Sequence, residues 1–245
     1  MFKHKSEKLV ASASLLAMSL LGSSVATAQS ITVYYNPRPP YLVMQEGFLT
    51  GLTGSPAVAA FKAAGQTIAI KEMPATRQLE MIKANAGQEC GVGWFKNPER
   101  EGFAKFSKPI YQDEPQVALT AASNKKLKNG DPIETVLQNK DLTLLVKQSY
   151  SYGKALDVLI EKHQPRRNSV TVENIQMFKM IQSERADYMF TAPEEAAVTI
   201  AAAGFQSGDF NLIKPGNMPK GELRHIMCSK SVPDDVMAKL NAAIK

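Results

Sequence analysis

A short apolar run in the first half of the sequence ends in two aromatic residues and is followed by an arginine. The run Cys90–Phe95 is typical of a buried strand between turns, and Arg100 follows it after a polar turn. A guanidinium can hold a carboxylate through two parallel hydrogen bonds, and Trp94 and Phe95 can form an apolar wall beside it. The pattern predicts a site for a small carboxylate-bearing solute. Two alternatives stay open: Arg100 could pair with a glutamate on either side of it, and Phe95 could belong to the core.

Further candidate residues lie in three other segments. Three prolines within residues 36–41 stiffen a loop that presents Arg38 and Tyr41. Arg77 lies in the first turn of a predicted helix, where a cation is unfavourable unless an anion is near. A polar turn ahead of another predicted helix offers hydroxyl groups and a helix N-terminus, which suit an anion or a polar group. Its candidate residues are Ser149, Ser151 and Tyr152. Ser151 could instead simply cap the helix.

The sequence offers little for catalysis. His163 stands among basic residues at a predicted helix end, and His225 lies in an apolar strand, where a core or hinge role is expected. The serines lack the pattern of a nucleophile elbow, and no phosphate loop, dinucleotide fingerprint or metal-ligand spacing is present. Glu194 and Glu195 form a pair in the first turn of a helix, where we expect surface positions. We therefore expect a binding protein rather than an enzyme, with neither a cofactor nor a metal ion.

The first 28 residues have the composition of an export signal. Three lysines precede a leucine- and serine-rich apolar run, and Ala26-Thr-Ala28 fits the small-x-small cleavage pattern. We expect cleavage after Ala28 and a periplasmic protein; the alternative is a membrane anchor. The net charge of +6 is spread along the chain, which argues against nucleic-acid binding. We expect a monomer whose partner is a small molecule.

Strands and helices alternate along the rest of the chain. The predicted strands are 31–35, 68–73, 90–95, 116–122, 142–146, 170–172, 186–191, 210–213 and 223–229. Between them lie helices predicted at 57–64, 75–84, 133–137, 154–162 and 175–183, and two more end near 203 and 244. Two such strand–helix–strand sets predict an α/β protein of two lobes, each a mostly parallel sheet covered by helices, with a ligand cleft between them. We predict lobe 1 at 29–115, lobe 2 at 116–214, and a return to lobe 1 at 215–245.

Several motifs resemble the family 3 extracellular solute-binding proteins, the type II periplasmic fold of polar amino-acid ABC importers. The resemblance covers nearly all of residues 31–245. The matching pieces are Arg38-Pro-Pro-Tyr41, Asn97-Pro-Glu-Arg100, Phe106-Ser-Lys-Pro-Ile-Tyr111, Lys147-Gln-Ser-Tyr-Ser151, Arg185-Ala-Asp187 and Leu240-Asn-Ala-Ala-Ile244. The resemblance implies that Arg100 grips a ligand carboxylate, that Tyr41 packs on the ligand, and that residues 149–152 contact it from the second lobe. It also implies an inner-membrane ABC permease as a partner.

The sequence departs from the family pattern in two places. The aspartate that binds the ligand ammonium in amino-acid receptors is replaced by Ala192, with Thr191 beside it as a candidate contact. The stretch Gly51–Gly54 also lacks the usual acid. An anionic or otherwise different small solute is therefore favoured over an α-amino acid. Other roles on the same fold are a ligand-sensing partner of a receptor, an accessory protein of another periplasmic system, and a dehydratase-like enzyme.

Cys90 and Cys228 are the only cysteines of the chain. In an oxidising compartment they could form one disulfide, or they could be two separate buried thiols. In the resembled family the strand that returns to the first lobe lies antiparallel to the third strand. The resemblance therefore implies a Cys90–Cys228 disulfide.

Overall fold

The computed structural model describes residues 1–2 and 30–245. The predicted signal beyond its first two residues, with its cleavage point after Ala28, lies outside the described residues. In the part of the chain that is described, no helix is both long enough and apolar enough to span a bilayer.

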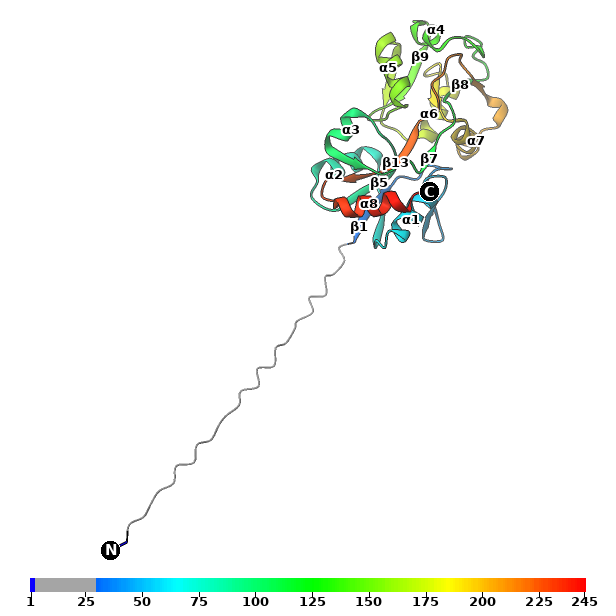
Figure 1. The fold of residues 1–245 in the computed structure, drawn as a ribbon. Coiled ribbons are helices and arrows are strands. Elements are labelled where there is room, and N and C mark those ends of the chain that lie inside the picture. Colours follow the sequence, from blue (N-terminus) through cyan, green and yellow to red (C-terminus); the bar gives the residue numbers. More distant parts are fainter. Residues whose placement is uncertain (3–29) are drawn as a thin grey trace.

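Two lobes make up the folded part of the chain (Figure 1). The first lobe holds a six-stranded sheet in the order β4-β1-β5-β13-β6, with β7 also paired to β13. Its strands are β1 (Ile31–Tyr35), β4 (Ile68–Glu72), β5 (Glu89–Phe95), β6 (Ala104–Phe106), β7 (Tyr111–Gln112) and β13 (Leu223–Ser229). The first three are parallel, whereas β13 runs antiparallel to its neighbours. Its helices are α1 (Gly54–Ala63), α2 (Ala75–Ala84), α3 (Pro98–Phe103) and α8 (Asp234–Ala243).

The second lobe is built from two smaller sheets. β8 (Val117–Ala121) lies between β11 (Met189–Thr191) and β12 (Phe210–Ile213), and both pairings are antiparallel. β9 (Thr143–Lys147) and β10 (Arg166–Val170) are parallel, and a parallel bridge from Leu144 to Tyr188 joins the two sheets. The helices are α4 (Ile133–Gln138), α5 (Lys154–His163), α6 (Asn174–Gln182) and α7 (Pro193–Ala202). The expected α/β class and the covering helices are confirmed.

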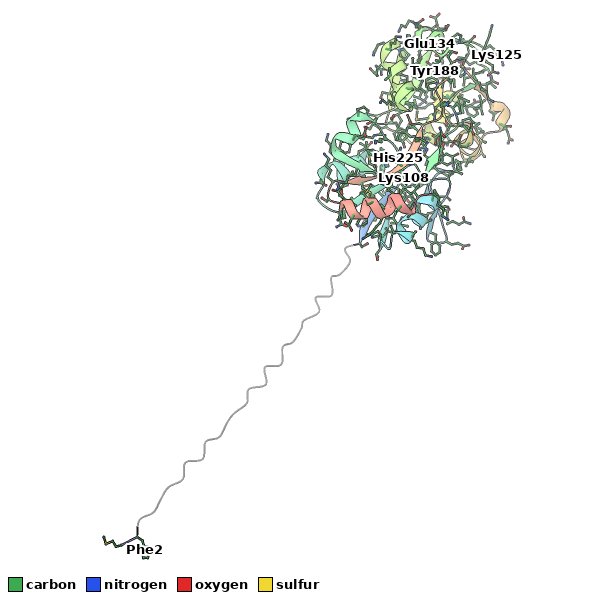
Figure 2. All side chains as sticks on the ribbon, in the orientation of Figure 1. Phe2, Lys108, Lys125, Glu134, Tyr188 and His225 are labelled. Atoms are coloured by element: carbon green, nitrogen blue, oxygen red, sulfur yellow. A yellow bond between two sulfur atoms is a disulfide. The ribbon has the colours of Figure 1, made fainter. Side chains whose placement is uncertain are left out.

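Each lobe has its own apolar core. Buried side chains of β1, β5, α1 and α8 form the first, including Val33, Phe61 and Leu240. The second lies around Leu144 and Tyr188, under α4 and α5. Figure 2 labels Tyr188 in the second lobe and His225 on β13 in the first. His225 is buried, as its apolar strand predicts, and its Nδ1 lies 2.7 Å from the carbonyl oxygen of Ser107.

The returning strand β13 is fastened to the centre of the first sheet. It pairs with β5 so that Cys228 lies opposite Cys90, with the two Cα atoms 4.0 Å apart. The two residues form a disulfide across 138 residues of sequence, as the resemblance implied. Residues near the C-terminus are thereby tied to the strand that leads to Arg100.

Three local predictions were wrong. β10 spans Arg166–Val170 rather than 170–172; it pairs only with β9, so its exposed side chains carry no apolar pattern. α1 spans Gly54–Ala63 and so begins three residues before the predicted start at residue 57. A hairpin of β2 (Val43–Gln45) and β3 (Phe48–Thr50) lies where no strand was predicted.

Candidate functional site

A cavity lies where strands β1 and β5 of the first lobe end. It encloses about 470 Å³ of space between protein atoms, part of it open to solvent. The first lobe supplies most of the lining, and Tyr150 and Ser151 cover it from the second lobe. The lining residues are Asn36, Arg38, Tyr41, Leu42, Thr53, Ala75, Val92, Gly93, Trp94, Phe95, Arg100, Tyr150, Ser151 and Arg224. This is the position at which open α/β sheets bind ligands.

The turn after β5 aims Arg100 at this cavity. Asn97 caps α3 by accepting a hydrogen bond from the Arg100 backbone N–H at 2.9 Å, and Pro98 occupies the first turn. The guanidinium folds back to its own strand, where Nη1 donates to the carbonyl oxygen of Phe95 at 2.8 Å. Nη2 donates to the carbonyl oxygen of Ser149 in the second lobe at 3.3 Å. Arg100 is 5% exposed and therefore fixed between the lobes.

An aromatic ring supports that guanidinium. The Arg100 Cζ lies 4.8 Å from the centroid of the Trp94 ring, which is within cation–π range. The indole Nε1 donates to Gln78 Oε1 at 3.2 Å, and Gln78 Nε2 donates to the carbonyl oxygen of Met73 at 2.7 Å. Gln78 on α2 is itself buried. A chain of contacts from α2 through Trp94 therefore positions Arg100.

The two other arginines of the cavity are each paired with a buried carboxylate. Arg38 binds Glu195 through two bonds, Nε to Oε1 at 2.6 Å and Nη2 to Oε2 at 2.7 Å. Arg224 binds Asp113 in the same way, at 2.5 Å and 2.6 Å. Charge-assisted, bidentate pairs of this kind are among the strong hydrogen bonds of proteins. The surface position expected for Glu195 is wrong: it is 1% exposed, because α7 turns it inward onto Arg38.

Arg100 differs from these two arginines in its partners. Among the described residues no carboxylate lies within ion-pair distance of its guanidinium, which bonds only to carbonyl oxygens. Desolvation lowers the pKa of Arg100, since burial disfavours its charge. Desolvation acts against Arg38 as well, but there the charge of Glu195 outweighs it and raises the pKa. Arg100 is therefore the arginine of this cavity whose charge is left without a counter-ion.

Tyr41 forms part of the cavity wall, and its hydroxyl group is unusual. The side chain is 1% exposed, and the oxygen has no hydrogen-bond partner among the described residues. Desolvation raises its pKa, so the phenol stays protonated at neutral pH. The Arg224 Cζ lies over its ring at 3.9 Å from the centroid. A bound solute with a hydrogen-bond acceptor could satisfy this buried donor.

The loop that covers the cavity is held by an aspartate of α5. Asp157 accepts a hydrogen bond from the backbone N–H of Tyr152 at 2.8 Å and another from the Ser151 hydroxyl. The N-terminal residue of α5 is preceded by Gly153, so Ser151 does not cap the helix directly. Tyr150 is thereby presented to the cavity from the second lobe.

The predicted contact residues fall into two groups. Tyr41, Trp94, Phe95, Arg100 and Ser151 line the cavity together.

The other predicted contacts lie away from it. Arg77 points outward with a side chain 63% exposed and pairs with Glu80 at 3.4 Å. Ser149 is exposed and reaches the site only through its carbonyl oxygen, which Arg100 binds. The Tyr152 hydroxyl accepts a hydrogen bond from the Lys147 backbone N–H at 2.9 Å. Thr191 is buried, and its hydroxyl lies 3.5 Å from Glu195 Oε2.

Several lining residues had no ligand contact predicted for them individually. Arg38 was expected only to be presented by its proline-rich loop, Tyr150 entered only within the range 149–152 that the resemblance placed at the ligand, and Arg224 was not predicted at all. Arg224 did leave a signal, because a charged residue inside the apolar strand 223–229 requires a buried partner. Within residues 1–2 and 30–245 no group of three or more His, Cys, Asp or Glu side chains is placed so that it could hold a metal ion.

Solved structures of other proteins share this architecture. An ancestral arginine-binding protein, solved with arginine bound, superposes with a TM-score of 0.69 at 18% identity, over 88% of this chain and 90% of that one. The chain has the fold of the two-lobed periplasmic binding proteins. ArtJ, an arginine-, lysine- and histidine-binding protein of Geobacillus stearothermophilus, gives a TM-score of 0.69 at 17% identity, over 88% of both chains.

A third neighbour comes from glutathione import in Streptococcus mutans, a system of GshT and the cystine ABC importer TcyBC. It gives a TM-score of 0.69 at 15% identity, over 87% of this chain and 86% of the other. No family model matches the sequence, and no curated protein does. The neighbours support the resemblance to the family 3 solute-binding proteins at the level of the fold.

Proposed function

We propose that this protein is a periplasmic solute-binding protein that captures a small carboxylate-bearing solute on Arg100 and delivers it to an ABC importer. The observation that carries the proposal is the buried guanidinium of Arg100, which faces the cavity and bonds only to carbonyl oxygens. A buried charge is stable only when it is paired, so this position favours an incoming anion. The role proposed is binding and not catalysis.

Other features of the cavity support an anionic ligand. Ala75, the first residue of α2, is part of the lining, so the amide groups of a helix N-terminus lie beside the cavity. The described lining residues include three arginines and no acidic side chain. Ala192, which stands where amino-acid receptors have an aspartate, is buried at the start of α7. The cavity thus offers donors for a carboxylate and no free acid for an ammonium group.

The contacts of Arg100 with both lobes support closure of the lobes over a bound solute. Arg100 belongs to the first lobe but also bonds the Ser149 carbonyl of the second. A solute that binds Arg100 beneath Tyr150 would contact both lobes only when they are closed, and this difference in affinity would drive closure. The solved neighbours include proteins bound to arginine and to glutamine, both of which carry a carboxylate.

A thermal-shift screen tests the proposal. Small mono- and dicarboxylates would be compared with their uncharged amides, with Arg100→Ala as the test variant and Arg77→Ala as its matched control. A carboxylate at about 100 times its Kd should raise the Tm by about 5–10 °C. The shift should disappear in Arg100→Ala and persist in Arg77→Ala, whose side chain is exposed. If the amides raise the Tm as much as the carboxylates do, Arg100 does not have the proposed role. The same holds if a carboxylate still raises the Tm of Arg100→Ala.

A further inference from the structure

Glu195 and the residues around it form a cation site inside the protein, and the Arg38 guanidinium fills it. Glu195 is 1% exposed and uses both carboxylate oxygens to bind Arg38. Asn174 of α6 also donates to Glu195 Oε1, at 2.7 Å, which fixes the carboxylate in place. The pKa of Glu195 is lowered, because the charge of Arg38 and these hydrogen bonds outweigh desolvation. Glu195 is therefore a fixed negative charge that faces the Arg38 guanidinium.

Two aromatic rings complete the site around the guanidinium. The Arg38 Cζ lies 5.4 Å from the centroid of the Tyr41 ring and 5.4 Å from that of the Tyr150 ring. Two rings within cation–π range and a bidentate carboxylate therefore surround this guanidinium. Tyr150 and Glu195 belong to the second lobe, whereas Arg38 and Tyr41 follow β1 in the first. The side chain of one lobe thus occupies a site for a cation that the other lobe largely supplies.

We infer that Arg38 is a specificity-determining residue: it occupies the Glu195 cation site from within, so that solutes bearing an ammonium or guanidinium group are excluded and anionic solutes are admitted at Arg100. This deepens the proposed function by naming the ligand class, and it rests on that function only for the anion bound at Arg100. The cation site itself consists of Glu195, which Asn174 holds in place, and the two tyrosine rings, and it does not depend on Arg100. Removing the Arg38 side chain should therefore open a site for a free guanidinium compound.

Chemical complementation of Arg38→Ala tests the inference. The probe is N-ethylguanidine, which corresponds to the atoms removed by the substitution, and ethylamine serves as its control for charge without guanidinium geometry. Binding would be followed by the Tm and by calorimetry. N-ethylguanidine should bind Arg38→Ala at least about tenfold more tightly than it binds the unaltered protein. The reason is that two charge-assisted hydrogen bonds to the vacated Glu195 carboxylate should lower the Kd by at least that factor. The double variant Arg38→Ala/Glu195→Gln should lose this gain.

Folding of the variant is covered by the same experiment. If Arg38→Ala folds only when N-ethylguanidine is present, and ethylamine does not replace it, the probe fills the site and the inference holds. The inference is overturned if Arg38→Ala gains no affinity for the probe, or if the double variant binds it equally well. It is also overturned if Arg38→Ala stays unfolded with the probe while the double variant folds.

The outcome is independent of the carboxylate screen. Gain of N-ethylguanidine binding with no carboxylate ligand found would uphold the cation site and refute the proposed function. Carboxylate binding at Arg100 without any gain in Arg38→Ala would do the reverse.

Discussion

The guanidinium of Arg100 lies over the indole ring of Trp94, with its Cζ 4.8 Å from the ring centroid. The two residues come from consecutive elements, the end of β5 and the first turn of α3, so the turn between them sets the direction of the charge. Trp94 is the single tryptophan of the chain. Its emission therefore reports directly on the candidate site.

Substituting Gln78 by leucine should disturb this arrangement. The Trp94 indole N–H would lose its buried acceptor, which costs about 1–3 kcal/mol of unfolding free energy. Urea denaturation followed by Trp94 emission measures the loss, and a titration of the best carboxylate measures its effect on affinity. Gln176→Leu is the matched control, because Gln176 is exposed on α6. Equal stability and affinity in the two variants would show that Gln78 does not position the ring.

The contribution of Glu195 to stability should depend on pH. Its pKa is lower in the folded protein than the ordinary value of 4.5, so between the two values the unfolded chain binds more protons and stability rises with pH. The stabilisation is fully present above pH 4.5 and is lost as the pH falls through the folded-state value. Denaturation between pH 3 and 7 measures the unfolding free energy of the unaltered protein and of Glu195→Gln. The difference between these two free energies should shrink only in the acid range. A constant difference would contradict the pairing with Arg38.

Removing one partner of the Arg224–Asp113 pair should be strongly destabilising. Asp113→Ala leaves a buried guanidinium without its counter-ion, which costs about 3–5 kcal/mol. The double variant Asp113→Leu/Arg224→Met should recover most of the loss, because both charges are gone. Asp235→Ala, which breaks an exposed pair with Lys239, should leave the unfolding free energy unchanged. If Asp113→Ala and Asp235→Ala lose the same unfolding free energy in urea, the buried pair contributes no more to stability than the exposed pair does.

The disulfide between Cys90 and Cys228 should contribute mainly to stability. Cross-linking β5 to β13 restricts the unfolded chain, and its removal by Cys90→Ala/Cys228→Ala should cost about 2–4 kcal/mol. Ligand affinity should be retained, because neither cysteine lines the cavity. A reducing agent should destabilise the unaltered protein and have no further effect on the double variant. An unaltered protein indifferent to reductant would argue against the cross-link.

The sequence predicted the cavity position of residues that are placed by their local structure and missed contacts that depend on distant partners. Arg100 could be found because strand, turn and N-cap stand within a few residues of it. Arg77 occupies a similar first-turn position, but α2 turns that side of the helix to solvent, and no pattern in the sequence separates the two cases.

The pairing of Arg38 with Glu195 could not be predicted from the sequence, for a physical reason. The residues stand 157 positions apart, in different lobes, and their contact depends on how the lobes close. Glu195 looked like an ordinary acid in the first turn of a helix, where negative charge is favourable anyway. Burial decided its role, and burial is a property of the assembled fold.

A crystal structure with the best carboxylate from the screen is the most direct test of ligand capture by Arg100. We predict a carboxylate oxygen within about 3 Å of an Arg100 Nη atom, inside the cavity covered by Tyr150. A carboxylate bound elsewhere, with the Arg100 guanidinium still held only by the Phe95 and Ser149 carbonyls, would contradict it.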